Sequence, residues 1–380
     1  MSYLKERPTG PRLSASLPAA FVALAATIQR RTAGHAGRLV WLGMVLLGLL
    51  AYPLALPAGE AQPSADKPID PEQIRKDVKA TVADQKKDDK KDDKKDDKKE
   101  EKGAPLPLHC IEGVGGVFAT DTAYLVNPPK KGEIAGLPAF EGTFVDIGAS
   151  RWMTAFTATE NLIGRVELGY GWDHMTLGNL NRRIQQATTL DVHDNSADLH
   201  NFNARGLLVK DGDFGESWVP ALTLGIHYKY NQTESAINKD LGGILKSIGV
   251  TKDNGVDYTL YTTKMIKALP RPILVSAGAR ESCAAHIGLL GFTDQYRATA
   301  EGNVCVLLTD HFILAGEYRM KRSSYTEIPG LVAKEHDWWT TDVAYIITKR
   351  CTFGAGYGHF GDVLNHSANG VWGVKFKWEF

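Results

Sequence analysis

Apolar and polar residues alternate along the chain from about residue 108 to the C-terminal Phe380. The final segment shows this best, because one of its faces collects Trp372, Val374, Phe376, Trp378 and Phe380, and the other carries Lys375 and Lys377. A period of two separates the faces of a strand, whereas a helix repeats every 3.6 residues. The alternation therefore predicts an all-β domain over residues 108–380.

Twelve strands of this kind are predicted, near residues 113–126, 143–154, 161–173, 199–210, 218–230, 256–267, 272–281, 295–308, 311–321, 338–348, 352–360 and 371–380. From the second strand onward the connections alternate between short and long. This is the arrangement of periplasmic turns and external loops in a transmembrane barrel. An even strand number places both termini in the periplasm. The glycine-rich residues 111–118 leave a second possibility, that this stretch lies inside the lumen.

The positions of charged and aromatic residues distinguish a membrane barrel from a soluble sandwich. Several polar faces carry charges in the middle of a strand, and aromatic residues gather near strand ends. A lipid-facing apolar band with aromatic girdles and a wet lumen produces both features. Closure of the sheet also removes the unpaired edges that hydrocarbon cannot tolerate. We therefore expect a transmembrane antiparallel β-barrel of about twelve strands.

The first 107 residues have a different character. Residues 1–61 are predicted to be an export segment, because basic residues precede an apolar run at 39–56 and small residues follow it. A retained membrane anchor is the alternative, since 18 apolar residues nearly suffice to span a bilayer. Residues 62–107 contain a repeated Lys-Lys-Asp-Asp motif and little to bury. They are predicted to be a disordered periplasmic linker.

The overall composition excludes some classes of protein. Lys plus Arg and Asp plus Glu both number 44, and residues 103–380 are mildly acidic, so no nucleic-acid partner is expected. The four cysteines are scattered without a C-x-x-C pair, which argues against a metal or redox centre. Cys110 and Cys351 are the one pair expected at a similar depth in the barrel, so a disulfide between them stays open.

Two sets of residues are predicted to carry the function. The pore-lining set faces the lumen and comprises Arg165, Glu167, Arg205, His227, Lys229, Arg297, Glu301, Glu317, Arg319, Lys375 and Lys377. The membrane and assembly set lies on the outer face of the last strand and comprises Trp372, Phe376, Trp378 and Phe380. Mixed charge in a water-filled pore would set a transverse field and a slight preference for anions. The alternative is that these charges pair across a narrow, filled barrel.

Three other groups of residues have patterns that bear on the function. Asp191, His193, Asp194, Asp198 and His200 have a spacing compatible with a metal, but an exposed polar loop is the favoured interpretation. Asn365, His366 and Ser367 are adjacent, so alternating geometry sends neighbours to opposite sides and weakens any catalytic arrangement. Helices predicted near 177–190 and 236–248 either constrict the lumen or cap its mouth.

The last strand, ending in Phe380, resembles the C-terminal signature that the barrel-assembly machinery recognises in bacterial outer-membrane proteins. The stretch Ile111-Glu112-Gly113-Val114-Gly115-Gly116 is similar to the start of an uncharacterised family of outer-membrane proteins. This resemblance implies an outer-membrane location and the barrel-assembly machinery as a partner. It implies no activity, because that family has none established.

The sequence thus predicts a porin-like channel in the bacterial outer membrane for passive passage of small hydrophilic solutes. Its expected partners are outer-membrane lipids and those solutes, with the cell wall as a further partner of the linker, and no cofactor or metal is expected. The first alternative is a structural barrel tethered toward the cell wall. The second is an outer-membrane hydrolase acting on lipid or peptide.

Overall fold

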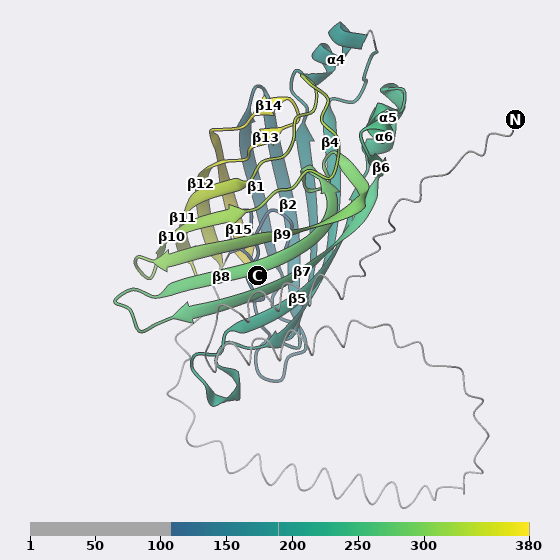
Figure 1. Ribbon diagram of the computed structural model, residues 1–380. Coiled ribbons are helices and arrows are strands. Elements are labelled where there is room, and N and C mark those ends of the chain that lie inside the picture. The colour runs from purple at the N-terminus through teal and green to yellow at the C-terminus, as the bar shows by residue number, and fades with distance from the viewer. Residues whose placement is uncertain (1–107, 189, 380) are drawn as a thin grey trace, which may run out of the picture. The chain divides into compact units, whose positions relative to one another are not determined.

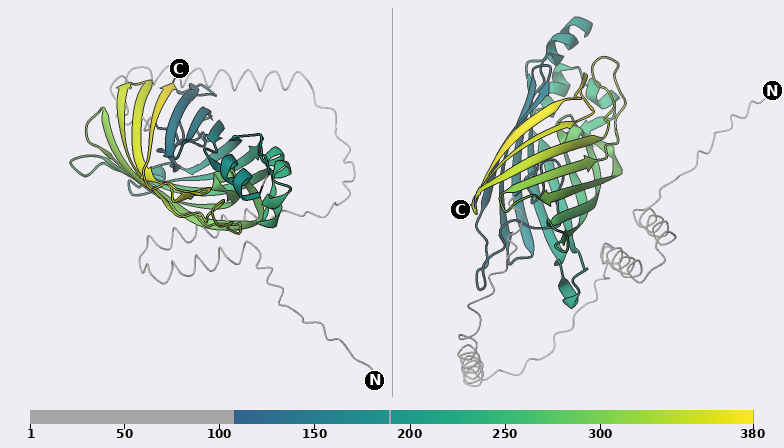
Figure 2. Two further views of the ribbon diagram at one scale, coloured as in Figure 1. Left: turned by 90° about the horizontal axis from the view of Figure 1, so that it is seen from above. Right: turned by 90° about the vertical axis from the view of Figure 1, so that its left-hand side faces the viewer.

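The computed structural model describes residues 108–188 and 190–379. Twelve strands dominate it: β1 (Ala139–Gly148), β2 (Arg151–Leu162), β3 (Val166–Thr176), β4 (Ser196–Val209), β5 (Ala221–Asn231), β7 (Asn254–Ile266), β8 (Ile273–Ala285), β9 (Gly291–Leu307), β10 (Phe312–Arg319), β11 (Trp338–Thr348), β12 (Cys351–His359) and β15 (Val371–Glu379). Each pairs antiparallel with the next along the chain, and β15 pairs with β1 to close the ring. The fold is a twelve-stranded antiparallel barrel (Figures 1 and 2).

The two ends of the barrel differ. At the terminal end, where β1 begins and β15 finishes, Ala139 pairs with Glu379. The opposite end, here called the loop end, carries the helices α4 (Leu180–Thr188), α5 (Glu234–Asp240) and α6 (Ile244–Ser247) and the short strands β6 (Val250–Lys252), β13 (Asp362–Val363) and β14 (His366–Ser367) (Figure 1). The helices expected near 177–190 and 236–248 therefore lie beyond the strands, at the mouth.

Two 3-10 turns complete the connections. The turn η1 (Asp213–Gly215) lies between β4 and β5, and η2 (His286–Gly288) lies between β8 and β9. Among the described residues, no helix has both the length and the apolar character needed to cross a membrane.

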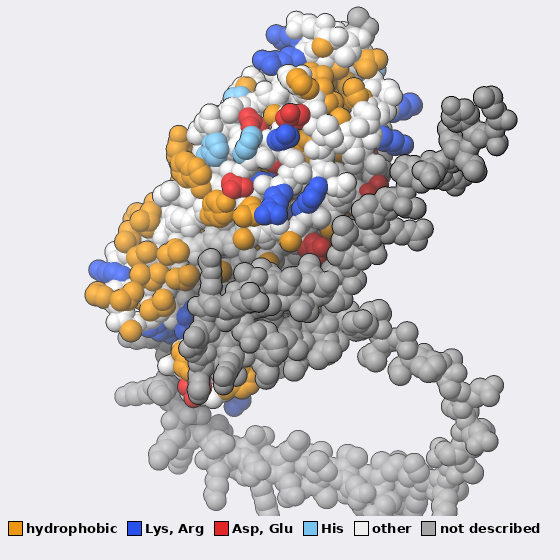
Figure 3. All heavy atoms as spheres, viewed as in Figure 1, with side chains coloured by type: hydrophobic (Ala, Val, Ile, Leu, Met, Phe, Trp, Pro, Cys, Tyr) orange, Lys and Arg blue, Asp and Glu red, His pale blue; other side chains and the backbone are white. Residues whose placement is uncertain are grey.

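The two faces of the barrel wall have opposite character. Along β5, burial alternates residue by residue, with Thr223, His227 and Lys229 buried and Leu224 and Tyr228 exposed. Large apolar side chains also lie on the outside of the other strands, and Figure 3 shows many of them on one side of the barrel. On β5 the buried set is mostly polar. This is the inverse of a soluble protein and the expected polarity of a barrel in lipid.

Two of the predicted strands were wrong. The predicted number of strands is still correct, because one predicted strand is absent from the wall and the other is in fact two strands. Residues 113–126 do not join the wall; they lie inside the lumen, which was the alternative for 111–118. The predicted strand 143–154 is instead the hairpin of β1 and β2, joined at residues 149 and 150. Both turn residues, Ala149 and Ser150, have positive φ angles of 53° and 60°. Such a turn normally uses Asn and Gly, so the sequence carried little sign of it.

Candidate functional site in the barrel lumen

Residues 108–126, here called the luminal segment, fill the interior of the barrel. Nearly all of their side chains are buried, and Cys110, Ile111 and Val114 are completely inaccessible. The segment folds back on itself through short bridges, in which His109 pairs with Gly115 and Gly116 with Asp121. It forms no regular ladder with the barrel strands. Polar side chains of the wall must therefore satisfy much of its backbone.

Glu317 on β10 shows how the wall does this. Its carboxylate accepts hydrogen bonds from the backbone N–H groups of Phe118, Ala119 and Thr120, at 2.8–3.1 Å. The Thr120 hydroxyl donates a further bond of 2.6 Å to the same carboxylate. Hydrogen bonds to a charged acceptor are stronger than those between neutral groups. One wall carboxylate thus holds three successive amides of the luminal segment.

Other wall residues bind the rest of the segment in the same way. Arg205 on β4 donates to the carbonyl oxygen of Thr122 at 2.8 Å. Glu167 on β3 accepts from the N–H of Val126 at 2.7 Å. Lys375 on β15 donates to the carbonyl oxygens of His109 and Val117. The segment is therefore held by polar contacts from strands all around the barrel.

Glycines allow the luminal segment to lie directly against the wall. Gly113 has a φ of +85°, and a Cβ there would be 2.7 Å from the carbonyl oxygen of Tyr170. A Cβ on Gly169 of β3 would be 2.0 Å from the carbonyl oxygen of Gly113. Only glycine combines this backbone conformation with so close an approach. The glycine-rich stretch 111–118 is thus explained by its position in the lumen.

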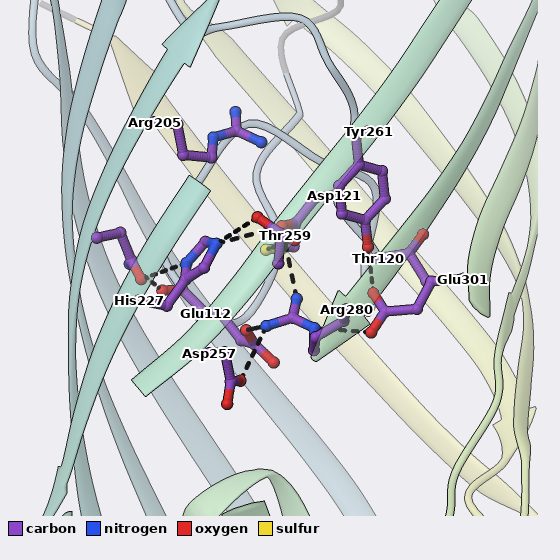
Figure 4. A network of polar contacts seen from close by, with 12 residues as sticks. Glu112, Thr120, Asp121, Arg205, His227, Asp257, Thr259, Tyr261, Arg280 and Glu301 are labelled. Atoms are coloured by element: carbon purple, nitrogen blue, oxygen red, sulfur yellow. Dashed lines mark hydrogen bonds and ion pairs between the residues drawn. The ribbon is translucent and has the colours of Figure 1, made fainter. Parts of the chain in front are cut away.

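At the centre of the lumen lies a network of buried charges (Figure 4). Glu112 of the luminal segment is surrounded by three cations: Arg280 on β8 at 2.9 Å, Arg319 on β10 at 2.8 Å and Lys229 on β5 at 3.4 Å. All four side chains are at most 4 % exposed. Bare charges at such depth would be very costly, so each must be paired.

Wall carboxylates hold these cations in place. Asp257 on β7 lies 2.9 Å from Lys229 and 3.1 Å from Arg280. Glu301 on β9 lies 2.7 Å from Arg280 and 3.2 Å from Arg319. Around Glu112, the wall therefore offers three cations against two carboxylates. Glu112 supplies the third negative charge.

Next to this cluster, the same segment presents a second carboxylate. Asp121 lies 3.5 Å from Arg280 and 4.0 Å from His227. Arg205 forms its own wall pair with Glu167 at 2.7 Å. The luminal segment contains no Lys or Arg. The side chains by which the segment joins these ion pairs are therefore both carboxylates.

Apolar clusters occupy other parts of the interior. Toward the loop end, residues of the strands and loops such as Met153, Leu177, Phe292 and Leu364 pack into a core cluster with Ile111. Elsewhere, Leu108 and Val117 of the segment pack with Leu274, Cys305 and Ile313 of the wall. Cavities beside the segment measure about 10 Å³ each, roughly the space of one water molecule. In this conformation the lumen is filled.

Most of the predicted pore-lining residues lie in this interior. Those buried inside the barrel are Glu167, Arg205, His227, Lys229, Glu301, Glu317, Arg319, Lys375 and Lys377. Arg165 lies instead in the turn before β3, where its half-exposed side chain pairs with Asp213 at 3.9 Å. Arg297 is exposed, in a part of β9 that extends past the pairing with β10. Both predictions failed because alternation gives the face of a residue but not where the barrel ends.

The predicted membrane residues of the last strand face outward. Trp372, Phe376 and Trp378 are 47 %, 45 % and 42 % exposed. Trp372 lies with its ring centroid 5.8 Å from that of Phe144 on the neighbouring β1. Phe380 lies outside the described residues. The three aromatic residues that are described occupy the position expected for contact with lipid.

The remaining candidate groups are separated by the fold. His193 pairs with Asp240 at 3.1 Å, whereas Asp198 pairs with His174 at 2.9 Å. Within residues 108–188 and 190–379, no group of three His, Cys, Asp or Glu side chains is arranged to hold a metal ion. Asn365 accepts a hydrogen bond from Arg151 in the loop end, beside His366 and Ser367 on β14.

The disulfide left open by the sequence does not form. All four cysteines are buried and free. Cys110 lies in the lumen, where its thiol donates to Asp121 at 3.3 Å, and Cys351 begins β12 in the wall.

Sequence reasoning missed the central part of the site. Asp121 falls in the strand predicted near 113–126, and Glu112 falls in the stretch 111–118 for which a position in the lumen is the alternative. Asp257 belongs to a strand whose two faces are not resolved by its pattern. The available signal was composition: a glycine-rich stretch with two acids and no base would make a poor lipid-facing strand. Its cationic partners are remote in sequence, so no local pattern reveals the pairing.

Comparisons with known proteins were made at the levels of family, sequence and structure. The model of a family described as "Protein of unknown function (DUF3034)" matches residues 108–374. A search of the curated proteins found no match.

Similar solved structures are outer-membrane proteins. The KdgM porin has a TM-score of 0.39 at 9 % identity, with 64 % of this chain and 99 % of that chain covered. The outer membrane protein Omp33 of Acinetobacter baumannii has a TM-score of 0.36 at 8 % identity, with 65 % and 99 % covered. The outer membrane phospholipase of Salmonella typhi has a TM-score of 0.33 at 8 % identity, with 66 % and 93 % covered.

Proposed function

The chain belongs to the DUF3034 family, whose function is unknown, and we propose from its geometry that it is an outer-membrane channel for small hydrophilic solutes, closed by its own luminal segment. The outer face of the barrel wall supports the proposed location in the membrane. Its outer face is rich in exposed aromatic and aliphatic side chains, including Phe156, Leu224 and Phe376. In water such a surface would aggregate, whereas in hydrocarbon it is stabilised.

The observation that carries the proposal is the charged wall beneath the luminal segment. A barrel that is filled permanently gains little from ionic residues, because well-packed apolar residues of similar volume are often as stable or more so. A wall that is periodically wetted needs polar side chains. Lys229, Arg280 and Arg319 would be hydrated, rather than left bare, once the segment moved away. The lumen is thus suited to filling with water.

Conductance in a planar bilayer tests this proposal. The variant Glu112→Gln with Asp121→Asn removes both carboxylates by which the luminal segment pairs with the wall cations. Breaking a buried ion pair costs about 3–5 kcal/mol, so the segment should leave its site more often. We expect rare, brief openings from the wild-type protein and openings at least tenfold more frequent from the variant.

Glu216→Gln is the matched control, because this exposed glutamate lies in the turn between β4 and β5. It should behave as the wild type. Insertion of each protein is verified by heat-modifiable migration on gels. If fully inserted wild-type protein and the double variant both pass no current, the channel proposal is wrong.

A structural barrel is the second candidate, and the filled lumen favours it. Apolar clusters occupy parts of the interior beside the charged network. In that case residues 62–107 would serve as a tether toward the cell wall. Cell-wall binding by the full chain, together with the absence of conductance, would support this function.

Other parts of the proposal concern residues outside the described range. We propose that residues 1–61 direct export and residues 62–107 form a periplasmic linker. Both termini would then lie in the periplasm, and Phe380 would present the signal to the barrel-assembly machinery. Sequencing the N-terminus of the mature protein tests the export segment.

A further inference from the structure

The position of Glu112 indicates what kind of solute the lumen binds. This carboxylate is a ligand held by the wall, because both of its oxygens contact cations. Oε1 lies 2.8 Å from Arg319, and Oε2 lies 2.9 Å from Arg280 and 3.4 Å from Lys229. The three cations come from β5, β8 and β10. They therefore converge on one point from different parts of the wall.

Wall residues contribute to this convergence, although Arg319 and Arg280 also contact the luminal segment, at the carbonyl oxygen of Ala119 (3.1 Å) and at Asp121 (3.5 Å). Asp257 and Glu301 are wall residues, and each contacts two of the three cations. Carboxylate partners of this kind orient Arg and Lys side chains, so the wall itself supplies part of the geometry and keeps it when the segment leaves. With Glu112 absent, three cations would face two carboxylates. A net positive charge would remain at the point that Glu112 now occupies.

The geometry points to a carboxylate-binding site in the lumen, in which Glu112 stands in for the carboxylate group of a small hydrophilic solute. A solute of this class competes with Glu112 and releases the luminal segment. This inference rests on the proposed channel and names its substrate class. It also gives the segment a regulatory role, because the ligand favours the open state by binding only there.

Labelling of Cys110 measures release of the segment without requiring any current. Its thiol is completely buried beside Asp121 in the lumen. The other three cysteines are replaced by alanine, and the full-length protein is treated with a small methanethiosulfonate reagent. The rate of labelling then follows the fraction of time that the segment is displaced.

Glucuronate is the probe, and glucose is the neutral control of similar size. A ligand that binds only the displaced state raises its population by a factor of one plus the ligand concentration over Kd. At ten times its Kd, glucuronate should therefore speed labelling about tenfold. Glucose should have no effect. Glucose 6-phosphate tests the class of anion, and an effect equal to that of glucuronate would overturn the carboxylate assignment.

Two variants and one control make the test specific. Glu112→Gln should speed labelling in the absence of any solute, because the segment loses its ion pairs. Arg319→Gln should reduce the effect of glucuronate, whereas Glu216→Gln should preserve it. If Arg319→Gln fails to fold, Glu112→Gln alone decides: unchanged labelling would show that Glu112 does not hold the segment and would overturn the inference.

The two proposals can fail separately. Conductance without any difference between glucuronate and glucose in the labelling rate would remove the carboxylate site and leave the channel. Faster labelling with glucuronate in a protein that never conducts would remove the channel and leave a luminal carboxylate receptor.

Discussion

Gly169 fixes how closely the luminal segment approaches β3. A Cβ at this position would lie 2.0 Å from the carbonyl oxygen of Gly113, which is backbone and has little freedom to move. We expect Gly169→Ala to displace the segment and to lower the free energy of unfolding by about 1–3 kcal/mol, the usual cost of overpacking. Thermal unfolding followed by circular dichroism measures the loss. Faster labelling of Cys110 would report the displacement.

Gly206→Ala on β4 is the matched control, since a Cβ there meets nothing within 4 Å. It should change stability by less than about 1 kcal/mol, the approximate range of glycine-to-alanine effects on the backbone. Equal losses in both variants would contradict the close contact between Gly169 and the segment.

Single residues also show what the sequence could predict. Period-two alternation placed Lys229, Glu301 and Arg319 on the inward face, and the structure buries them there. Alternation contains no information about which residues meet across the lumen. Glu112 contacts three strands that follow it far along the chain, so its role required the three-dimensional fold.

Among the elements, the loops that cover the mouth should respond to acid. His286, in the turn between β8 and β9, is buried, and this burial lowers its pKa. Its Nε2 lies 2.8 Å from the hydroxyl of Tyr325, which donates to the carbonyl oxygen of Ala333. Its backbone N–H donates to Glu335, which pairs with Lys321 at 2.9 Å. Burial acts to raise the pKa of Glu335, but the opposing charge of Lys321 leaves it lowered.

Both shifts have the same consequence for stability. A group whose pKa is lowered by folding binds more protons in the unfolded state, so stability falls as the pH falls. For His286 the loss begins near its ordinary value of 6.5 and ends at its lower folded pKa. We therefore expect proteolysis within residues 320–337 to become faster as the pH falls below about 6.5. In His286→Gln the part of this change that begins near pH 6.5 should disappear, and its persistence would exclude His286 as the cause.

Elements also show where prediction from sequence fails. The long strands from β3 onward were recognised by their alternation, with ends shifted by a few residues. The hairpin of β1 and β2 was merged into one strand because Ala149 and Ser150 adopt positive φ without the residues that usually mark such a turn. Residues 113–126 mix apolar and small residues, so their pattern predicts a strand and leaves the lumen as the alternative for residues 111–118. Their partners in the structure are polar side chains of the wall.

For the whole molecule, the outer face predicts where the protein resides. We expect the mature protein to fractionate with outer membranes and to migrate differently on gels before and after heating. Leu224 on β5 is 41 % exposed on this face. Leu224→Arg should impair insertion, because an arginine facing lipid at the bilayer midplane costs about 2–4 kcal/mol.

Leu224→Ile is the control for this variant, since it keeps an apolar side chain at the same position. It should insert normally. Recovery of the wild-type protein as a soluble periplasmic species would contradict the membrane location, as would normal insertion of Leu224→Arg.

The contacts of the luminal segment also impose an order on biogenesis. Its amides and carbonyls are bound by side chains from β2 to β15, including Thr159, Glu317 and Lys375. Although it precedes every strand in the chain, it cannot acquire this conformation until the last strand has joined. Its contacts are therefore among the most distant in sequence and should form late in folding. A newly synthesised barrel would pass through a stage with an unfilled, hydrated interior, and maturation would end when the N-terminal residues of the fold settle into it.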